Sequence, residues 1–228
     1  MGFKLAITSA IFCILFLSVP RITKAQDSCV PPELDSFLES SREALHFSGS
    51  FFPSPEAKTL CLSKDGQRLK WLGVRWYGPE QGALFVLDNN DRRIATLPLG
   101  AVRNLRAGPR FLGSEAETVW VDYLASQGTG YLLVKTALIT FSGDKIVTVW
   151  SHVIFERNFV LPSEEGTEEE YTVTGSEGGS ITVSGIRKIF PPPSKMDTKA
   201  NPQNIKKLEE EKFCWIEIIG GYTRCKEK

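Results

Sequence analysis

The feature that most constrains the fold is a long stretch of alternating apolar and polar residues, which runs from 118 to 157. Alternation with a period of two predicts β-strands. Two short segments with turn-forming residues, at 126–129 and 143–144, divide the stretch into three parts. Three long strands joined by tight turns form an antiparallel meander, so the sequence predicts a mainly β protein.

Alternating segments on both sides of this meander predict a larger set of hairpins. They lie at 60–77, 83–99 and 169–190. Each is bounded by Gly, Pro, Asn or Asp residues, which favour turns. Short strands joined by such turns are typical of an antiparallel β-sandwich or of an open barrel. This is the architecture that we predict for the main domain, residues 26–190.

Two helices are predicted outside these strands. Leu34 and Leu38 fall at helical spacing within 33–46, which indicates an amphipathic helix. The charged segment 205–212 is predicted to form a second, short helix, after a Pro-rich and polar linker at 191–204. The chain then ends in a hairpin that docks on the main domain, because an isolated hairpin is only marginally stable.

The first 25 residues have the pattern of a secretory signal peptide. Lys4 precedes an apolar run at 5–19, and Thr23 and Ala25 provide the small residues that a cleavage site needs. We therefore expect cleavage after Ala25. The mature protein is expected to be secreted or periplasmic and to contain no integral membrane segment.

The cysteines support an oxidising compartment. Of five cysteines, Cys13 lies in the predicted signal peptide, and the other four form an even set. Two disulfides are therefore predicted. Four cysteines allow three connectivities, of which proximity in the sequence favours Cys29–Cys61 together with Cys214–Cys225. Metal binding is not expected, because no C-x₂-C pair occurs and neither of the two histidines is near a cysteine.

The charge balance argues against nucleic acid as a partner. The chain has 27 basic and 27 acidic residues, and three of the basic ones lie in the predicted signal peptide. A slightly acidic mature chain also has no reason to bind an anionic membrane. The arginines between 92 and 110 are expected to be solvated or paired with acidic residues such as those at 164–170. Residues 88–91 predict a turn, and they lack the residue spacing that a calcium-binding loop needs. No cofactor is expected.

The turns of the meander also predict how its strands pair. With a two-residue turn at 143–144, Lys135 lies opposite His152. With a four-residue loop at 126–129, Trp120 lies opposite Lys135. One face of the meander is then almost wholly apolar and belongs to the core, whereas the other face mixes aromatic, apolar and charged side chains.

This mixed face is the candidate ligand site. It carries Trp120, Asp122, Lys135, Trp150 and His152. Tryptophans beside charged groups are suited to stack on a glycan or to hold a peptide of a protein partner. The competing interpretation is that the N-terminal helix covers this face. We favour this second interpretation, because a sheet that is half apolar on its second side normally needs a cover.

Three classes of function remain open. The main prediction is a non-catalytic binding or interaction module, and a structural component of an envelope assembly is the first alternative. A hydrolase is the second alternative: the sequence has no G-x-S-x-G, H-E-x-x-H or phosphate-loop motif, but Asp122 and Glu156 form a carboxylate pair on the mixed face. A buried aromatic face favours the structural role, an open face favours binding, and a cleft with converging carboxylates favours the enzyme.

Overall fold

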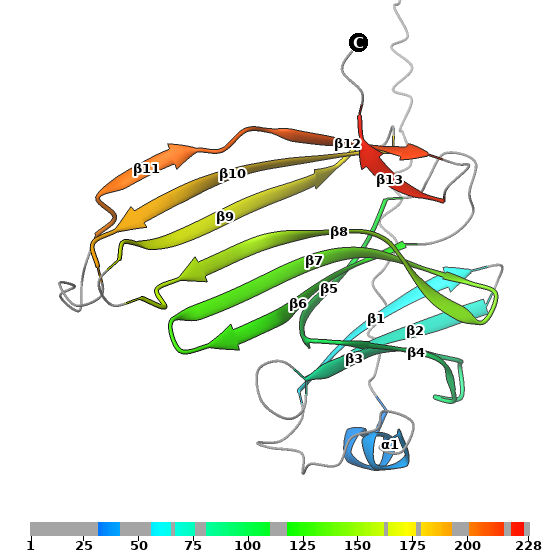
Figure 1. Cartoon of the computed structure of the whole chain (residues 1–228). Coiled ribbons are helices and arrows are strands. Elements are labelled where there is room, and N and C mark those ends of the chain that lie inside the picture. Colours follow the sequence, from blue (N-terminus) through cyan, green and yellow to red (C-terminus); the bar gives the residue numbers. More distant parts are fainter. Residues whose placement is uncertain are drawn as a thin grey trace, which may run out of the picture.

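The chain consists mainly of antiparallel β-strands, as the sequence predicts. The computed structural model describes residues 32–41, 56–64, 67–75, 81–109, 118–161, 164–176, 179–192, 201–216 and 220–225. The predicted signal peptide at 1–25 lies outside these residues. The strands form two sheets, and neither sheet closes into a barrel within the described part of the chain (Figure 1).

The smaller sheet has four strands in the order β1-β2-β3-β4. They are β1 (Glu56–Lys64), β2 (Gln67–Arg75), β3 (Gly82–Leu87) and β4 (Arg93–Leu99). Every residue of β3 is buried. A strand that is buried along its whole length is covered on both faces, and the two covers of this sheet are a helix and the second sheet.

The helix α1 (Leu34–Ser41) covers one face of the small sheet. Leu38 is fully buried in a cluster with Leu72 and Val74. The ring of Phe37 meets the ring of Phe85 edge to face, with 5.0 Å between their centroids. Residues 42–46, which complete the predicted helix, lie outside the described residues. In Figure 1, α1 lies below the small sheet, on the side away from the large one.

The larger sheet has nine strands, in the order β13-β12-β10-β9-β8-β7-β6-β5, with β11 also paired to β10. Its strands are β5 (Ala101–Ala107), β6 (Thr118–Gly128), β7 (Tyr131–Ser142), β8 (Lys145–Asn158), β9 (Gly166–Gly175), β10 (Ser180–Phe190), β11 (Asn204–Lys207), β12 (Glu211–Ile216) and β13 (Gly221–Arg224). Because β9 occupies one edge of β10, both β11 and β12 lie along the other edge.

The two sheets pack face to face on one hydrophobic core. The small sheet contributes Trp71 and Leu84, and the large sheet contributes Val121 and Ile139, among others. The chain passes from one sheet to the other at Gly100, between β4 and β5. A Cβ atom at Gly100 would lie 1.7 Å from the carbonyl oxygen of Leu124, so the close approach of the two backbones requires glycine.

The predicted helix at 205–212 is wrong. Residues 204–207 form β11, and β12 begins at Glu211. Ile205 lies opposite Lys188, in an antiparallel pair with β10. The edge of β10 offers unpaired backbone groups, and pairing with them outweighs the modest helix propensity of Lys and Glu. In the predicted linker, residues 193–200 lie outside the described residues, and Asn204 already belongs to β11.

The predicted pairing of the meander is also wrong. Trp120 lies opposite Leu138, which lies opposite Trp150, so one row holds both tryptophans. Lys135 lies opposite Tyr123 and Val153, and His152 lies opposite Thr136. The first cause is the turn between β6 and β7, which spans residues 129–130 rather than 126–129. The second cause is a set of β-bulges, which shift the register within both pairs of strands.

The predicted C-terminal disulfide is present. Cys214 and Cys225 are bonded across the hairpin of β12 and β13, with 5.1 Å between their Cα atoms. Cys61, in β1, is also disulfide-bonded. Cys29, its predicted partner, lies outside the described residues.

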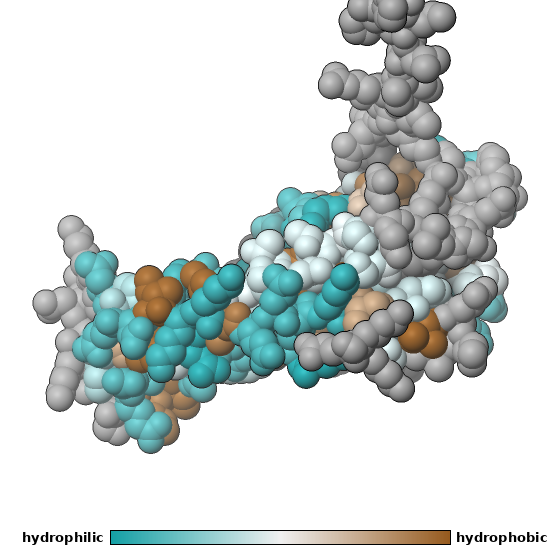
Figure 2. Space-filling view, turned by 90° about the horizontal axis from the view of Figure 1, so that it is seen from above, coloured by the Kyte–Doolittle hydropathy of each residue, from teal (hydrophilic) through white to brown (hydrophobic). Residues whose placement is uncertain are grey.

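Seen from above, the end of the molecule that carries β11 is mostly hydrophilic, with a few hydrophobic groups among the polar ones (Figure 2).

Candidate functional site

The structure brings Trp120 and Trp150 together in an aromatic cluster on the mixed face. Their rings meet edge to face, with 5.6 Å between the centroids. The cluster also contains Leu138, Ile181 and Val183. Only 8% of Trp120 and 7% of Trp150 is exposed, so neither ring offers a stacking surface to a ligand.

The cover of this cluster is the C-terminal hairpin. Phe213 and Trp215 of β12 and Tyr222 of β13 pack against it, and Phe213 lies 5.5 Å from Trp150 between ring centroids. The expectation that the N-terminal helix covers this face is therefore wrong. That helix packs on the small sheet (Figure 1), whereas the last strands of the large sheet cover the aromatic cluster on its middle strands.

The packing of Trp150 is apolar in character. Its indole N–H is buried and has no hydrogen-bond partner within the described part of the chain, and the same holds for the hydroxyl of Thr136. A buried indole usually finds an acceptor when its polar atom has a specific role. Trp150 therefore acts here as a large packing group.

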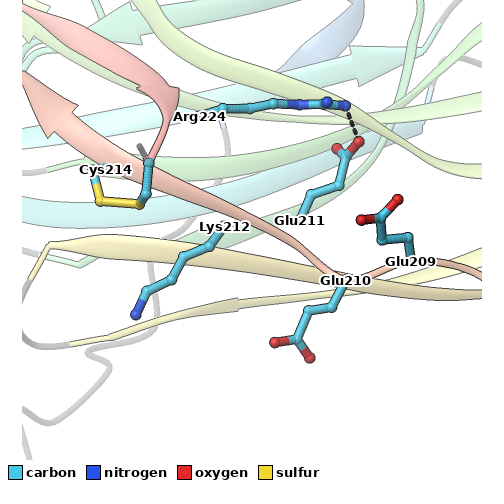
Figure 3. A pocket seen from close by; sticks show the side chains of 7 residues that line it. Glu209, Glu210, Glu211, Lys212, Cys214 and Arg224 are labelled. Carbon is cyan, nitrogen blue, oxygen red and sulfur yellow. Dashed lines mark hydrogen bonds and ion pairs between the residues drawn. A yellow bond between two sulfur atoms is a disulfide. The ribbon is translucent and has the colours of Figure 1, made fainter. Parts of the chain in front are cut away.

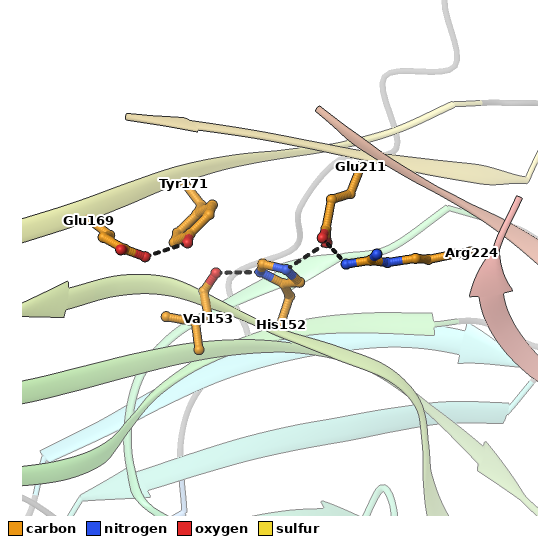
Figure 4. A network of polar contacts seen from close by, with 6 residues as sticks. All are labelled: His152, Val153, Glu169, Tyr171, Glu211 and Arg224. Atoms are coloured by element: carbon orange, nitrogen blue, oxygen red, sulfur yellow. Dashed lines mark hydrogen bonds and ion pairs between the residues drawn. The ribbon is translucent and has the colours of Figure 1, made fainter. Parts of the chain in front are cut away.

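His152 connects this cluster to the C-terminal hairpin through polar contacts (Figure 4). Its ring stacks on Trp150, with an interplanar angle of 13° and 5.8 Å between centroids. Nδ1 lies 2.6 Å from the carbonyl oxygen of Val153, and Nε2 lies 3.3 Å from Oε2 of Glu211. Glu211 also forms an ion pair with Arg224 of β13. Because the carbonyl and the carboxylate only accept, the ring donates both bonds only as an imidazolium.

A second polar group lies beside His152 on β9 and β10. The hydroxyl of Tyr171 donates to Oε2 of Glu169 at 2.5 Å, and Nε of Arg187 donates to Oε1 of Glu169 at 2.6 Å. Burial, together with the hydrogen bond to Glu169, raises the pKa of Tyr171. Both oxygens of Glu169 therefore accept hydrogen bonds from neighbours in the same chain.

Asp122 and Glu156 do not form the acid–base pair that the hydrolase hypothesis needs. Asp122 forms an ion pair with Arg106 at 3.1 Å, next to Asn104. Asp122 lies opposite Thr136 of β7, whereas Glu156 lies opposite Leu133. Three residues along a strand correspond to about 10 Å, in addition to the separation across the strands. The two carboxylates therefore do not converge on one bond.

Lys135, the remaining candidate residue, is partly buried and lies outside the row of the two tryptophans. Of the candidate residues, the structure thus brings Trp120, Trp150 and His152 together and leaves Asp122 and Lys135 apart from them. The contacts of Glu211 and Arg224 with this group were missed by the sequence analysis. The sequence predicts a helix at 205–212, and a helix there would not place Glu211 on a strand paired with β10.

A groove beside the disulfide is lined mainly by charged residues (Figure 3). It has a volume of about 480 Å³ and is lined by Glu209, Glu210, Glu211, Lys212, Cys214, Arg224 and Cys225. Glu211 is held by Arg224 and His152. Among the described residues, no group of three or more His, Cys, Asp or Glu side chains is arranged to hold a metal ion.

The turn at 88–91 is closed by its own backbone. Oδ1 of Asp88 accepts hydrogen bonds from the N–H groups of Asn90 and Arg92, at 2.7 and 2.9 Å. This carboxylate therefore shapes the hairpin between β3 and β4.

No helix in the described part of the chain is long and apolar enough to cross a membrane.

Comparisons of the chain with protein-family models, with curated proteins and with solved structures found no match.

Proposed function

We propose that the chain is a non-catalytic protein-interaction module that is exported from the cytoplasm, to the periplasm or the exterior. The burial of Trp120 and Trp150 supports a protein partner over a glycan, because a glycan-binding site of this kind needs an open aromatic face. The contacts of Glu169, Glu211 and Asp122 within the chain also argue against a reacting group at these positions.

One observation carries this proposal. Val160 and Leu161 follow each other after β8, and each is 51% exposed. They border a pocket of about 470 Å³ that is also lined by Asn158, Glu164 and Glu165. Single exposed apolar residues are common on protein surfaces. Here two adjacent apolar residues lie beside a hollow with acidic residues at its rim. Such a site is suited to bind a partner protein through an apolar side chain that is flanked by basic residues.

The test compares three purified forms of the mature protein: wild type, V160S/L161S and, as a matched control, I94S. Ile94 is 40% exposed and lies on β4 of the other sheet. Each form is immobilised, and the captured secreted or periplasmic proteins are identified by mass spectrometry. We expect one partner to be retained by wild type and I94S and to be lost with V160S/L161S. Equal capture by all three folded forms would refute this site.

Export has a separate test. The mass of the protein recovered from the periplasm or the medium should correspond to a chain that begins at Gln26. A full-length chain found only in the cytoplasm would contradict export and leave the binding result unaffected.

A structural component of an envelope assembly is the second candidate. The buried aromatic cluster favours it, since it indicates that the mixed face stabilises the fold and does not hold a ligand. A structural component is expected to sediment with the envelope fraction after a high-salt wash. An interaction module is expected in the soluble fraction.

A further inference from the structure

The outer edge of the large sheet is open beside β11. All four residues of β11 are exposed, and Ile205 is 59% exposed. β11 pairs with β10 on its inner side, while β13 covers β12 only from Phe213 onward. Among the described residues, no strand pairs with the outer side of 205–210. An edge with unpaired N–H and C=O groups is a template for another strand.

The hydrogen bonds of this edge fix which residues face outward. The N–H group of Leu208 donates to the carbonyl oxygen of Gly185 at 2.8 Å, so Leu208 faces β10. In an antiparallel ladder, alternate residues direct both backbone groups to the same side. Lys207, the last residue of β11, therefore directs its backbone groups to the open side, and residues 208–210 connect β11 to β12 without belonging to either strand.

The charges along the edge have no ion-pair partner among the residues that the structure describes. Lys206, Lys207, Glu209 and Glu210 are exposed, and none of them is in an ion pair within the described residues. The inner neighbour of Lys206 is Arg187, which has the same charge and is itself paired with Glu169. A negative side chain on the outer side would give Lys206 a partner of opposite charge. In Figure 3, Glu210 points away from Arg224, the residue to which Glu211 is bound.

The order of these charges is self-complementary. Residues 206–210 read Lys-Lys-Leu-Glu-Glu. When two copies of this segment run antiparallel and are centred on Leu208, Lys206 faces Glu210 and Lys207 faces Glu209, each in both directions. We infer that two copies of the chain pair along 206–210 to form a symmetric dimer with one continuous sheet.

The same edge disfavours other pairings. A shift of the register by two residues places like charges opposite each other, and a neutral strand leaves the lysines without partners. The N–H group of Cys225 donates to the carbonyl oxygen of Lys212 at 2.8 Å, so β13 blocks the edge beyond Glu211. The paired segment is therefore short, and the dimer is expected to dissociate on dilution and at high salt.

The test uses sedimentation velocity on the mature, full-length protein over a range of concentrations. Wild type is expected to form dimers. K206E/K207E and E209K/E210K each place like charges across the axis and are expected to be monomers. An equimolar mixture of these two variants should form a heterodimer, because each supplies the charges that the other lacks. The quadruple variant K206E/K207E/E209K/E210K restores the pattern in reverse and should dimerise again.

Two controls separate this interface from other effects. K145E changes one charge at the exposed first residue of β8 and should leave the dimer intact. V160S/L161S, which tests the other surface, should also leave it intact. Circular dichroism checks that each variant is folded. A monomeric wild type at all concentrations overturns the inference and leaves the edge to a different protein. A dimer that persists in K206E/K207E, or folded variants that fail to associate when mixed, also overturns it.

Discussion

Trp150, on β8, contacts aromatic side chains of two other strands and of its own: Trp120 on β6, Phe213 on β12 and His152 on β8. Only 7% of Trp150 is exposed, so replacing its side chain with a methyl group would leave a cavity in the cluster. We expect W150A to lower the free energy of unfolding by about 3–5 kcal/mol, measured by urea titration. I94A, at an exposed position, should change it by less than about 0.5 kcal/mol. Similar values for both variants would show that the cluster is not part of the core.

The stability of the C-terminal hairpin is expected to depend on pH through Tyr222. Burial raises its pKa to about 12, whereas an unfolded tyrosine titrates near about 10. Its contribution to stability is therefore fully present below about pH 10 and is lost as the pH rises through about 12. The urea midpoint of Y222F should fall less over this range than that of wild type. Parallel declines of the two proteins would contradict this prediction.

The residues of the meander show how far a single sequence predicts such a site. The alternating pattern correctly places Trp120 and Trp150 on one face, because side-chain period depends on local conformation alone. It does not place Lys135 correctly, since bulges beside Val134 and Leu138 shift the pairing. A bulge adds one residue to one strand, and its position depends on packing between strands that are distant in the sequence.

The C-terminal hairpin is the element on which the candidate site depends most. Its disulfide closes a segment with a sequence separation of 11, for which the chain-entropy model gives about 3 kcal/mol. We expect C214S/C225S to lose roughly this amount in urea titration. Acrylamide should also quench the tryptophan fluorescence more strongly, because Phe213 and Trp215 are then held less firmly. Unchanged stability and unchanged quenching together would show that the strand pairing alone holds the hairpin.

The segment 205–212 and the helix α1 mark the limit of prediction at the scale of elements. Residues 205–212 contain Ile205 and Leu208 as their only apolar side chains, so neither a helical nor a strand pattern is strong. The strand forms because β10 presents an open edge. For α1, the sequence predicts the apolar stripe of the helix but not the sheet face against which that stripe packs. The small sheet and the mixed face were both apolar enough to receive it.

At the scale of the whole molecule, the two sheets depend on each other. Val86 and Trp71 from the small sheet share one core with Val119 and Phe141 from the large sheet. Neither sheet can bury these side chains alone, so each contributes the cover of the other. Loss of the contact between the sheets should therefore unfold both in a single transition.

Gly100 provides the test of this coupling, because it lies at the corner between the sheets. An added Cβ would clash with the carbonyl oxygen of Leu124 at 1.7 Å, and a backbone atom cannot rotate away. We expect G100A to destabilise the protein by about 1–3 kcal/mol or more, and hydrogen exchange should speed up by similar factors in β3 and β7. G128A is the matched control, since a Cβ there meets no atom within 4 Å. Faster exchange in only one sheet would mean that the two sheets unfold independently.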